Sequence, residues 1–289
     1  MGQGGIKVKK MRSVPIYIIL GLLCAALMFP VYIAVILPFQ ASDELSQTIT
    51  PLIKNVEEYI RIDFAAQYPT LEHFSGLLLY TPEFYTVFWN SLLMAGIILL
   101  FQIIVAIPSA WAFARLNFKG KNLLFNAYVL FMLMPFQVTM LSQYIVLNNM
   151  ELMNTRLAVI LPAIFSTLPV FLIYRGFADI PPDVADSARI DGANEFQVLR
   201  YIGIPLGKSG ILSCIVLSFL DIWNMVEQPL AFLKDKELYP LSLYLPTIDI
   251  SNAEMLFAAA AVTLIPAAFV FIIGQDFLEQ GIIATALKE

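Results

Sequence analysis

Residues 180–196 read IPPDVADSARIDGANEF and say more about the fold than any other part of this 289-residue chain. Pro182 is typical of the first turn of a helix, because a missing N–H costs nothing there. Gly192 can end that helix in a left-handed conformation, and Asn194 can cap a following helix that ends at Pro205. The stretch therefore predicts two short helices joined by a sharp bend.

The first of these helices has two kinds of face. Val184, Ala185 and Ala188 share one side by their spacing, while Asp186 and Arg189 point elsewhere. A rigid knob of this kind, lying along the inner face of a membrane, is suited to transmitting a push from a soluble partner. An amphipathic hairpin that only anchors the loop to the membrane surface is the alternative.

The composition of the whole chain is that of a membrane protein. Hydrophobic residues make up 59% of it and charged residues 13%. Soluble domains usually have about 45–50% apolar and about 25% charged residues. So little polar surface excludes an ordinary soluble enzyme, a disordered chain and a basic nucleic-acid binder. The chain is expected to be integral to the lipid bilayer.

Six apolar stretches approach the length of about 20 residues that a membrane-spanning helix needs. They cover residues 14–37, 87–112, 123–147, 157–174, 211–226 and 255–273. Pro135 interrupts the third stretch. The first stretch has no clear cleavage site after it, so we interpret it as a retained anchor. The expected fold class is an all-α polytopic membrane protein with six transmembrane helices.

Lys and Arg mark one side of these spans. Twelve of the 17 basic residues fall before the first span, between the second and third, between the fourth and fifth, or after the sixth. The positive-inside rule then puts both termini in the cytoplasm. The expected parts are a cytoplasmic N-terminus at 1–13, a first transmembrane helix at 14–38, an extracytoplasmic loop at 39–86, a transmembrane core at 87–273 with an inner connection at 175–210, and a cytoplasmic tail at 274–289.

Few residues outside the inner connection suggest a chemical site. The acidic, aromatic-rich loop at 39–86 predicts a small external cap or a docking surface. Cys24 and Cys214 lie in separate apolar stretches, so we expect packing residues and neither a disulfide nor a zinc site. His73 is the only histidine, and a single histidine in a loop is expected to be solvated. The sequence therefore indicates no metal site and no catalytic residue.

The inner connection resembles the EAA loop of ABC-importer permeases, whose pattern is Glu-Ala-Ala, a downstream Gly and a later apolar-Pro pair. The matching positions are Asp186-Ser187-Ala188, Gly192 and Ile204-Pro205-Leu206, with the carbohydrate-importer core intact as Ile190-Asp191-Gly192-Ala193. Further matches in the family's order are Asn90-Ser91-Leu92, Ala112–Lys121, Met134–Val138, Trp223-Asn224 with Pro229-Leu230, and Gly281–Lys288. The chain is most similar to the six-helix subunit of maltose-transporter-type sugar permeases.

The sequence departs from the family pattern at two places. Asp186 and Ser187 replace the Glu and the first Ala, and Met225-Val226 replaces the acid–aromatic pair that normally follows Trp-Asn. The resemblance implies the type I ABC-importer permease fold. It also implies a coupling helix, from about Asp183 to Asn194, that docks on a cytosolic ABC ATPase dimer.

Site residues and partners also follow from the resemblance. The ATPase-coupling residues would be Asp183, Asp186, Ser187, Ala188, Arg189, Asp191, Gly192, Ala193 and Glu195, with Arg200 at the rim. ATP and Mg would bind the ATPase, so this chain would be a non-catalytic subunit that binds no cofactor. A second homologous permease and an extracytoplasmic solute-binding protein would complete the transporter in the bacterial cytoplasmic membrane. The binding protein would meet the outer loop at 227–254, and the tail at 285–289 would touch the ATPase.

Gly207-Lys208-Ser209 superficially matches the end of a phosphate-binding P-loop. That motif needs a glycine where Ile202 stands, and Pro205 disrupts the loop. We therefore expect ATP to bind another subunit and not this chain.

A polar stripe follows the fifth apolar stretch. It consists of Cys214, Ser218, Asp221, Asn224 and Gln228, which share one helical face. A carboxylate inside a membrane costs roughly 2.5–3.5 kcal/mol, so Asp221 should face protein or water. The stripe either lines the path of the solute, with Trp223 as a stacking face, or makes polar contacts between helices. The candidate translocation-path residues are Ser218, Asp221, Trp223, Asn224, Gln228 and Gln137.

Together these features predict a transmembrane permease subunit of a binding-protein-dependent ABC importer, which moves a sugar or oligosaccharide inward by ATP-driven alternating access. A permease for another polar solute, such as a sugar phosphate or a polyamine, is the nearest alternative. A membrane enzyme, or a proton-coupled secondary transporter that uses Asp221, belongs to a different class. The ATP dependence of uptake distinguishes these alternatives.

Overall fold

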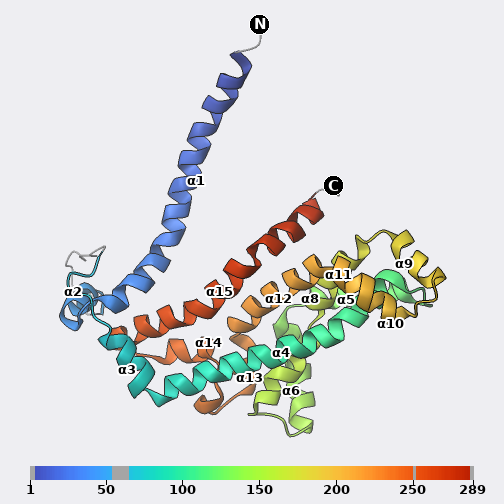
Figure 1. Cartoon of the computed structure of the whole chain (residues 1–289). Helices are drawn as coiled ribbons and strands as arrows, with labels where there is room; N and C mark the ends of the chain where they lie inside the picture. The colour runs from blue at the N-terminus through green and yellow to red at the C-terminus, as the bar shows by residue number, and fades with distance from the viewer. Residues whose placement is uncertain (1–3, 54–64, 250–251, 287–289) are drawn as a thin grey trace. The chain divides into compact units, whose positions relative to one another are not determined.

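The computed structural model describes residues 4–53, 65–249 and 252–286, and Figure 1 shows the course of the chain. Every regular element in those ranges is a helix. The longer helices are α1 (Gly4–Ile36), α2 (Ser42–Ile53), α4 (Pro82–Arg115), α5 (Lys121–Met132), α6 (Phe136–Asn149), α8 (Thr167–Ala178), α12 (Lys208–Trp223) and α15 (Ala253–Ala286). The shorter ones are α3 (Glu72–Tyr80), α7 (Arg156–Ile164), α9 (Pro182–Ile190), α10 (Glu195–Val198), α11 (Ile204–Leu206), α13 (Glu227–Phe232), α14 (Leu241–Tyr244), the 3₁₀ helices η1 (Leu37–Phe39), η3 (Lys236–Leu238) and η4 (Leu245–Thr247), and the π-helix η2 (Leu199–Gly203).

Among the residues that the structure describes, four helices are long and apolar enough to cross a membrane. The count rises to six if each of two bent helix pairs is one span. The four are Pro15–Phe39, Pro82–Arg115, Arg156–Ala178 and Ala253–Leu278, and the bent pairs are α5 with α6 and Glu195–Leu206 with α12. The expected all-α polytopic fold is therefore confirmed. In the first span, none of the 18-residue apolar window is buried within the chain.

The third apolar stretch forms two helices and not one straight span. Helices α5 and α6 are bent by 101° relative to each other. Pro135 has no N–H, and its ring disfavours a helical conformation of the preceding residue. The chain therefore leaves the helix after Met132, and Pro135 becomes the N-cap of α6 with an extended backbone. The interruption expected at Pro135 is confirmed, whereas the size of the bend depends on packing.

The second helix of the inner connection extends further than expected. It passes through the π-helical turn Leu199–Gly203, ends at Leu206 and not at Pro205, and meets α12 at a bend of 73°. Pro205 cannot donate a hydrogen bond to the carbonyl four residues earlier, and the wider turn lies directly before it. The triplet Gly207-Lys208-Ser209 thus joins two helices, whereas a P-loop follows a strand.

Several other helix bounds differ from the apolar stretches, and α12 ends at Trp223 and not at Val226. Helix α4 begins at Pro82, before Val87, and α15 continues beyond Ile273 to Ala286. Apolar length marks the part of a helix that lipid can surround. A helix goes on into polar residues wherever its backbone hydrogen bonds continue.

The chain forms two compact units, of which the first comprises residues 1–82 and 248–263. Cys24 was expected to be a packing residue, but it lies on α1 and is exposed, so it does not pack within this chain. A small apolar core joins the end of α1, α2 and the start of α15. Its buried members are Leu37, Leu45, Ile49 and Ala253. Helix α2, in the loop between the first two spans, therefore packs against the end of the first span and the start of α15.

His73 lies in α3 and is only 7% exposed, so the prediction that it is a solvated loop residue is wrong. Its Nε2 lies 2.9 Å from the carbonyl oxygen of Gln40, and its Nδ1 lies 3.4 Å from Glu254 Oε2. The expectation failed because the polar, acidic composition of the loop hid the helix that buries this ring. Two of the aromatic residues that make this loop aromatic-rich, Tyr59 and Phe64, lie outside the described residues.

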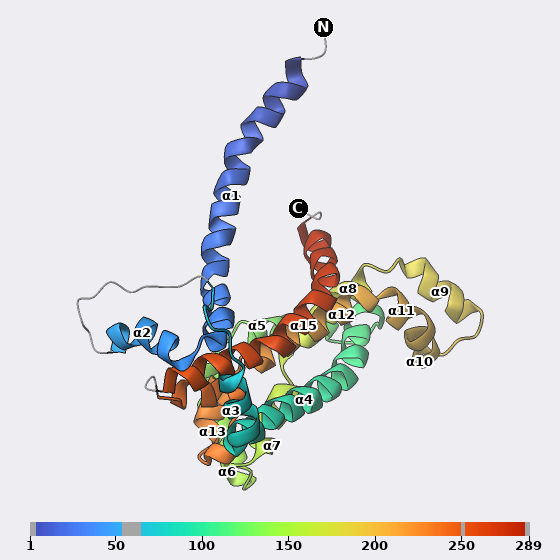
Figure 2. The ribbon, with the colours of Figure 1, turned by 60° about the vertical axis from the view of Figure 1, so that its left-hand side comes forward.

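The second unit comprises residues 83–247 and 264–289, and in it α8 and α12 run side by side (Figures 1 and 2). A Cβ added to Gly210 would lie 2.9 Å from the Cα of Gly176. The two backbones are thus in direct contact. Helices in lipid associate through such close packing of small residues, because lipid tails remove the hydrophobic drive between them.

A buried core connects α4, α8 and the inner connection. The rings of Trp111 and Phe177 lie 5.3 Å apart and nearly perpendicular, at 87°. A Cβ on Gly203 would lie 2.7 Å from Trp111, and one on Gly207 would lie 2.5 Å from Phe177. Cys214 is fully buried in the same core, as expected of a packing residue. The glycines thus leave room for the two aromatic rings.

Asn90 ties the N-terminal end of α4 to two other segments. Its Nδ2 donates to the carbonyl oxygen of Glu237 at 2.6 Å, and its Oδ1 accepts from Arg156 Nη2 at 2.8 Å. The neighbouring Ser91 Oγ accepts from the backbone N–H of Leu241 at 2.6 Å. These bonds hold the loop between α13 and α14 against α4.

Candidate functional site

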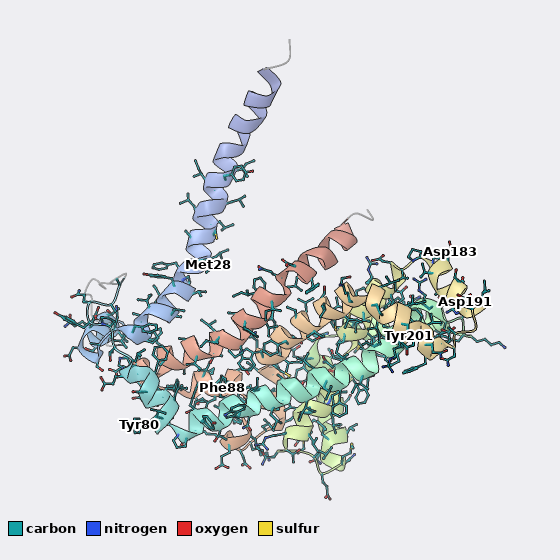
Figure 3. The ribbon with its side chains drawn as sticks, viewed as in Figure 1. Met28, Tyr80, Phe88, Asp183, Asp191 and Tyr201 are labelled. Atoms are coloured by element: carbon teal, nitrogen blue, oxygen red, sulfur yellow. The ribbon has the colours of Figure 1, made fainter. Side chains whose placement is uncertain are left out.

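The inner connection forms a helical knob, defined here as residues 182–206. It lies at one tip of the second unit, beyond the ends of α4 and α8 (Figures 1 and 2). Asp183 and Asp191 lie at its edge (Figure 3). Helix α9 starts at Pro182, and Ser187 Oγ donates to the carbonyl oxygen of Asp183 at 2.8 Å. The expected pair of helices with a bend between them is confirmed.

The bend begins at Gly192, whose φ of +87° is left-handed. Its N–H donates to the carbonyl of Arg189 at 3.1 Å, and the N–H of Ala193 donates to the carbonyl of Ala188 at 3.0 Å. This is the Schellman arrangement, which satisfies the last carbonyls of a helix. Most residues with a side chain would be strained at this φ, so glycine is favoured here and asparagine is the side chain best tolerated.

Asn194 starts the following helix with a capping box. The backbone N–H of Gln197 donates to Asn194 Oδ1 at 2.9 Å, and the N–H of Asn194 donates to Gln197 Oε1 at 2.8 Å. Both bonds satisfy N–H groups that have no partner inside the helix. Ala193 alone separates the glycine from this cap, so the bend has little freedom.

Arg189 and Glu195 bridge the two helices of the knob. Arg189 Nε donates to Glu195 Oε1 at 2.7 Å, and Arg189 Nη1 donates to Asp186 Oδ1 at 2.5 Å. The hydrogen bond to Glu195, ahead of the one to Asp186, raises the pKa of the Arg189 guanidinium. Trp111 Nε1 on α4 donates to Glu195 Oε2 at 3.4 Å. Glu195 thus links the bend of the knob to the C-terminal end of α4.

We predict that Glu195→Ala loosens the knob, because Arg189 loses its bonds across the bend and Trp111 loses its bond to the knob. Since the side chain of Glu195 is 45% exposed, water screens its interactions, and we expect the knob to lose only about 1 kcal/mol of local stability. That loss corresponds to roughly fivefold faster amide exchange over residues 183–198. Hydrogen exchange with mass spectrometry measures it. Asp186→Asn is the control, since it removes only a pair three residues apart on one helix, worth about 0.2–0.5 kcal/mol. Equal exchange in both variants would contradict the bridging role.

The exposed surface of the knob combines acids with apolar side chains. Asp183, Asp186 and Asp191 are exposed, and the side chain of Ile190 is 87% exposed. The apolar face of α9 differs from the expected one, because Ala185 and Ala188 turn toward the core while Val184 is 40% exposed. The core accepts the small alanines, which leaves the larger valine outside. A surface of this kind can receive a protein that carries basic and apolar groups.

The predicted stripe does not lie on one helix, because α12 ends at Trp223, Asn224 is its C-cap and Gln228 lies in α13. Of the four candidate path residues from Ser218 to Asn224, two are buried and two are exposed. Ser218 and Trp223 are buried, whereas Asp221 and Asn224 are exposed. Trp223 stacks on Phe219 at 5.5 Å, so one face of its ring is already covered. Ser218 Oγ lies 3.8 Å from Cys214 Sγ on the same helix, and Cys214 Sγ lies 3.8 Å from the carbonyl oxygen of Pro169 on α8. The contact of Cys214 fits the alternative of interhelical contact. The path roles of all six residues stay predictions.

Gln137 and Glu227 meet in a groove that the sequence did not indicate. Gln137 Nε2 donates to Glu227 Oε1 at 2.7 Å, joining the start of α6 to the start of α13. The groove has a volume of about 530 Å³. Its other lining residues are Phe136, Met140, Leu141, Tyr144, Leu230 and Ala231. Nothing in the spacing pairs positions 137 and 227, because the bend at Pro135 brings them together.

Comparison with known proteins identifies the family. Residues 102–284 match the family of the binding-protein-dependent transport system inner membrane component. This chain belongs to that family. The match contains the whole knob, α12 and all the candidate path residues, so membership rests on the part of the chain described above.

Several members of known role are similar over most of their length. The arabinooligosaccharides transport system permease protein AraQ of Halalkalibacterium halodurans is 27% identical over 89% of this chain and 93% of its own. The diacetylchitobiose uptake system permease protein DasC of Streptomyces coelicolor is 28% identical over 76% of this chain and 81% of its own. A solved bacterial ABC transporter involved in importing the acidic polysaccharide alginate shares the fold, with a TM-score of 0.79, 17% identity, and coverage of 93% of this chain and 97% of that one.

Proposed function

We propose that this chain is one permease subunit of an ATP-driven importer for a sugar or oligosaccharide. The observation that carries the proposal is the knob, which a Schellman turn, a capping box and the Glu195 bridge hold rigid while its outer surface stays exposed. A rigid projection can pass a displacement to the helices on which it is mounted. Membership of the binding-protein-dependent family and the named sugar permeases among its relatives support the choice of solute.

In this proposal the knob docks on a cytosolic ATPase dimer, which binds ATP and Mg, and this chain is not catalytic. A second, homologous permease completes the pathway, and an extracytoplasmic solute-binding protein delivers the solute. The chain would lie in the bacterial cytoplasmic membrane with both termini in the cytoplasm, as the distribution of basic residues indicates. The exposed Asp221 and Asn224, with Gln137 and Gln228, are the residues we propose for the path.

Uptake into proteoliposomes tests this function. The complete transporter is reconstituted with its binding protein, and uptake of a labelled oligosaccharide is followed with ATP inside or outside the vesicle. We expect uptake only when the ATPase and ATP are on the same side as the knob. Uptake that follows a proton gradient and survives removal of the ATPase would overturn the proposal. Competition by sugar phosphates or polyamines, but not by sugars, would assign another polar solute.

A further inference from the structure

The span formed by α7 and α8 contains a break. Helix α7 ends at Ile164 and α8 begins at Thr167, yet Arg156–Ala178 still qualifies as one membrane-length helix. Pro169 lies in the first turn of α8, where the N–H that proline lacks would have no helical partner. A break leaves carbonyls without their helical partners. Inside a membrane each such group needs another donor.

Gln102 supplies a donor at this break from a different helix. Its Nε2, on α4, donates to the carbonyl oxygen of Ala163 at 2.7 Å. The backbone N–H of Ser166 donates to the same oxygen at 3.2 Å. Gln102 is only 4% exposed. Its Oε1 has no hydrogen-bond partner among the described residues. Burial of a glutamine with one polar atom unsatisfied costs free energy. The bond from its nitrogen to Ala163 offsets part of that cost and fixes the orientation of the side chain.

Helix α4 is also bonded to the span of α7 and α8 at both ends of that span. Arg156, at the start of α7, donates to Asn90 on α4. Arg115, at the end of α4, donates to the carbonyl oxygens of Phe177 and Ile180, where α8 meets the knob. Helix α4 is thus bonded to this span before the break, at the break and after it in the chain.

From this geometry we infer that Gln102 is a positioning residue that locks the break, so that α4, α7 and α8 move as one body between the knob and the loop held by Asn90. The inference rests on the proposed function, because it concerns how a push on the knob is transmitted. Without the lock, α8 would bend at the break and absorb the displacement. The push would then not arrive at the other end of α7.

The experiment compares Gln102→Met with Ser109→Ala in the full transporter. Methionine keeps the length of the side chain and removes the hydrogen-bond donor, and its apolar side chain is compatible with a membrane-spanning helix. Ser109 is the matched control, since among the described residues its hydroxyl bonds to the carbonyl of Val105 on its own helix, at 2.7 Å, and to no other helix. Spin labels at Leu157→Cys on α7 and Ala178→Cys on α8, both exposed positions, report the distance across the break, with Cys24→Ser in every variant.

We expect a narrow distance distribution in the parent and in Ser109→Ala, and a broadened one in Gln102→Met. Solute taken up per ATP should fall roughly two- to thirtyfold in Gln102→Met alone, the range of a coupling change of 0.5–2 kcal/mol. A narrow distribution in Gln102→Met would overturn the inference. The distances are measured on the permease itself, so they stand apart from the proposed function, whose failure would be a parent transporter without ATP-dependent uptake.

Discussion

Replacement of Gly192 by proline should abolish most uptake while the protein still inserts into the membrane. Proline fixes φ near −65°, whereas Gly192 has a φ of +87° and donates an N–H to the carbonyl of Arg189. The variant therefore loses both the turn and a bond that closes α9. We expect at least about a tenfold loss of ATP-driven uptake, since each 1.4 kcal/mol is a factor of ten. Uptake by proteoliposomes, with ATP hydrolysis measured in parallel, checks this.

Gly192→Asn is the matched control, because asparagine tolerates the left-handed region better than other residues with a side chain. It should keep most of the uptake. A charge swap at the neighbouring Asp191, which is exposed, should also uncouple hydrolysis from uptake without disturbing insertion. Normal coupling in both Gly192→Pro and Asp191→Lys would exclude the knob as the element that transmits the push.

Gly210→Val should destabilise the second unit more than any surface change. Its Cβ would lie 2.9 Å from the Cα of Gly176 and 3.2 Å from its N, and backbone atoms cannot turn aside as a side chain can. Overpacking usually costs about 1–3 kcal/mol, and we expect the upper end because α8 and α12 must separate. A lower midpoint of thermal unfolding in detergent, and a lower yield of folded protein, are the measurements.

Gly96→Ala is the control for this substitution. It also lies in a membrane-spanning helix, but a Cβ there would meet nothing within 4 Å. Its unfolding midpoint should match that of the parent. If Gly210→Val unfolds at the same temperature as Gly96→Ala, the close approach of the two helices does not contribute to stability.

The features that the sequence predicted well are those written in consecutive residues. The bend at Gly192 and the cap at Asn194 need only a few neighbours each, and both are present. Apolar length likewise located the helices, since lipid imposes one thickness on every span. The resemblance of the inner connection to the EAA loop pointed to the family that the comparison confirmed.

What the sequence could not provide depends on residues far apart in the chain. The bond from Gln102 to Ala163 and the pair of Gln137 with Glu227 appear only once helices are placed side by side. Periodicity put Ser218 and Asp221 on one face, but neighbouring helices cover the first and leave the second exposed. His73 was misjudged for the same reason, because its partners come from the distant residues Gln40 and Glu254.

Helix α1 has a consequence for how the protein is oriented in the bilayer. None of its 18-residue apolar window is buried within the chain, and Ile33, near its C-terminal end, is partly buried against the small core of the first unit. Its basic flank, with Lys7, Lys9, Lys10 and Arg12, carries the positive charge that we expect to keep this end of the helix on the cytoplasmic side. Orientation and packing are thus expected to depend on different stretches: the charge beside α1 favours one direction across the bilayer, and most of the buried contacts belong to the later helices.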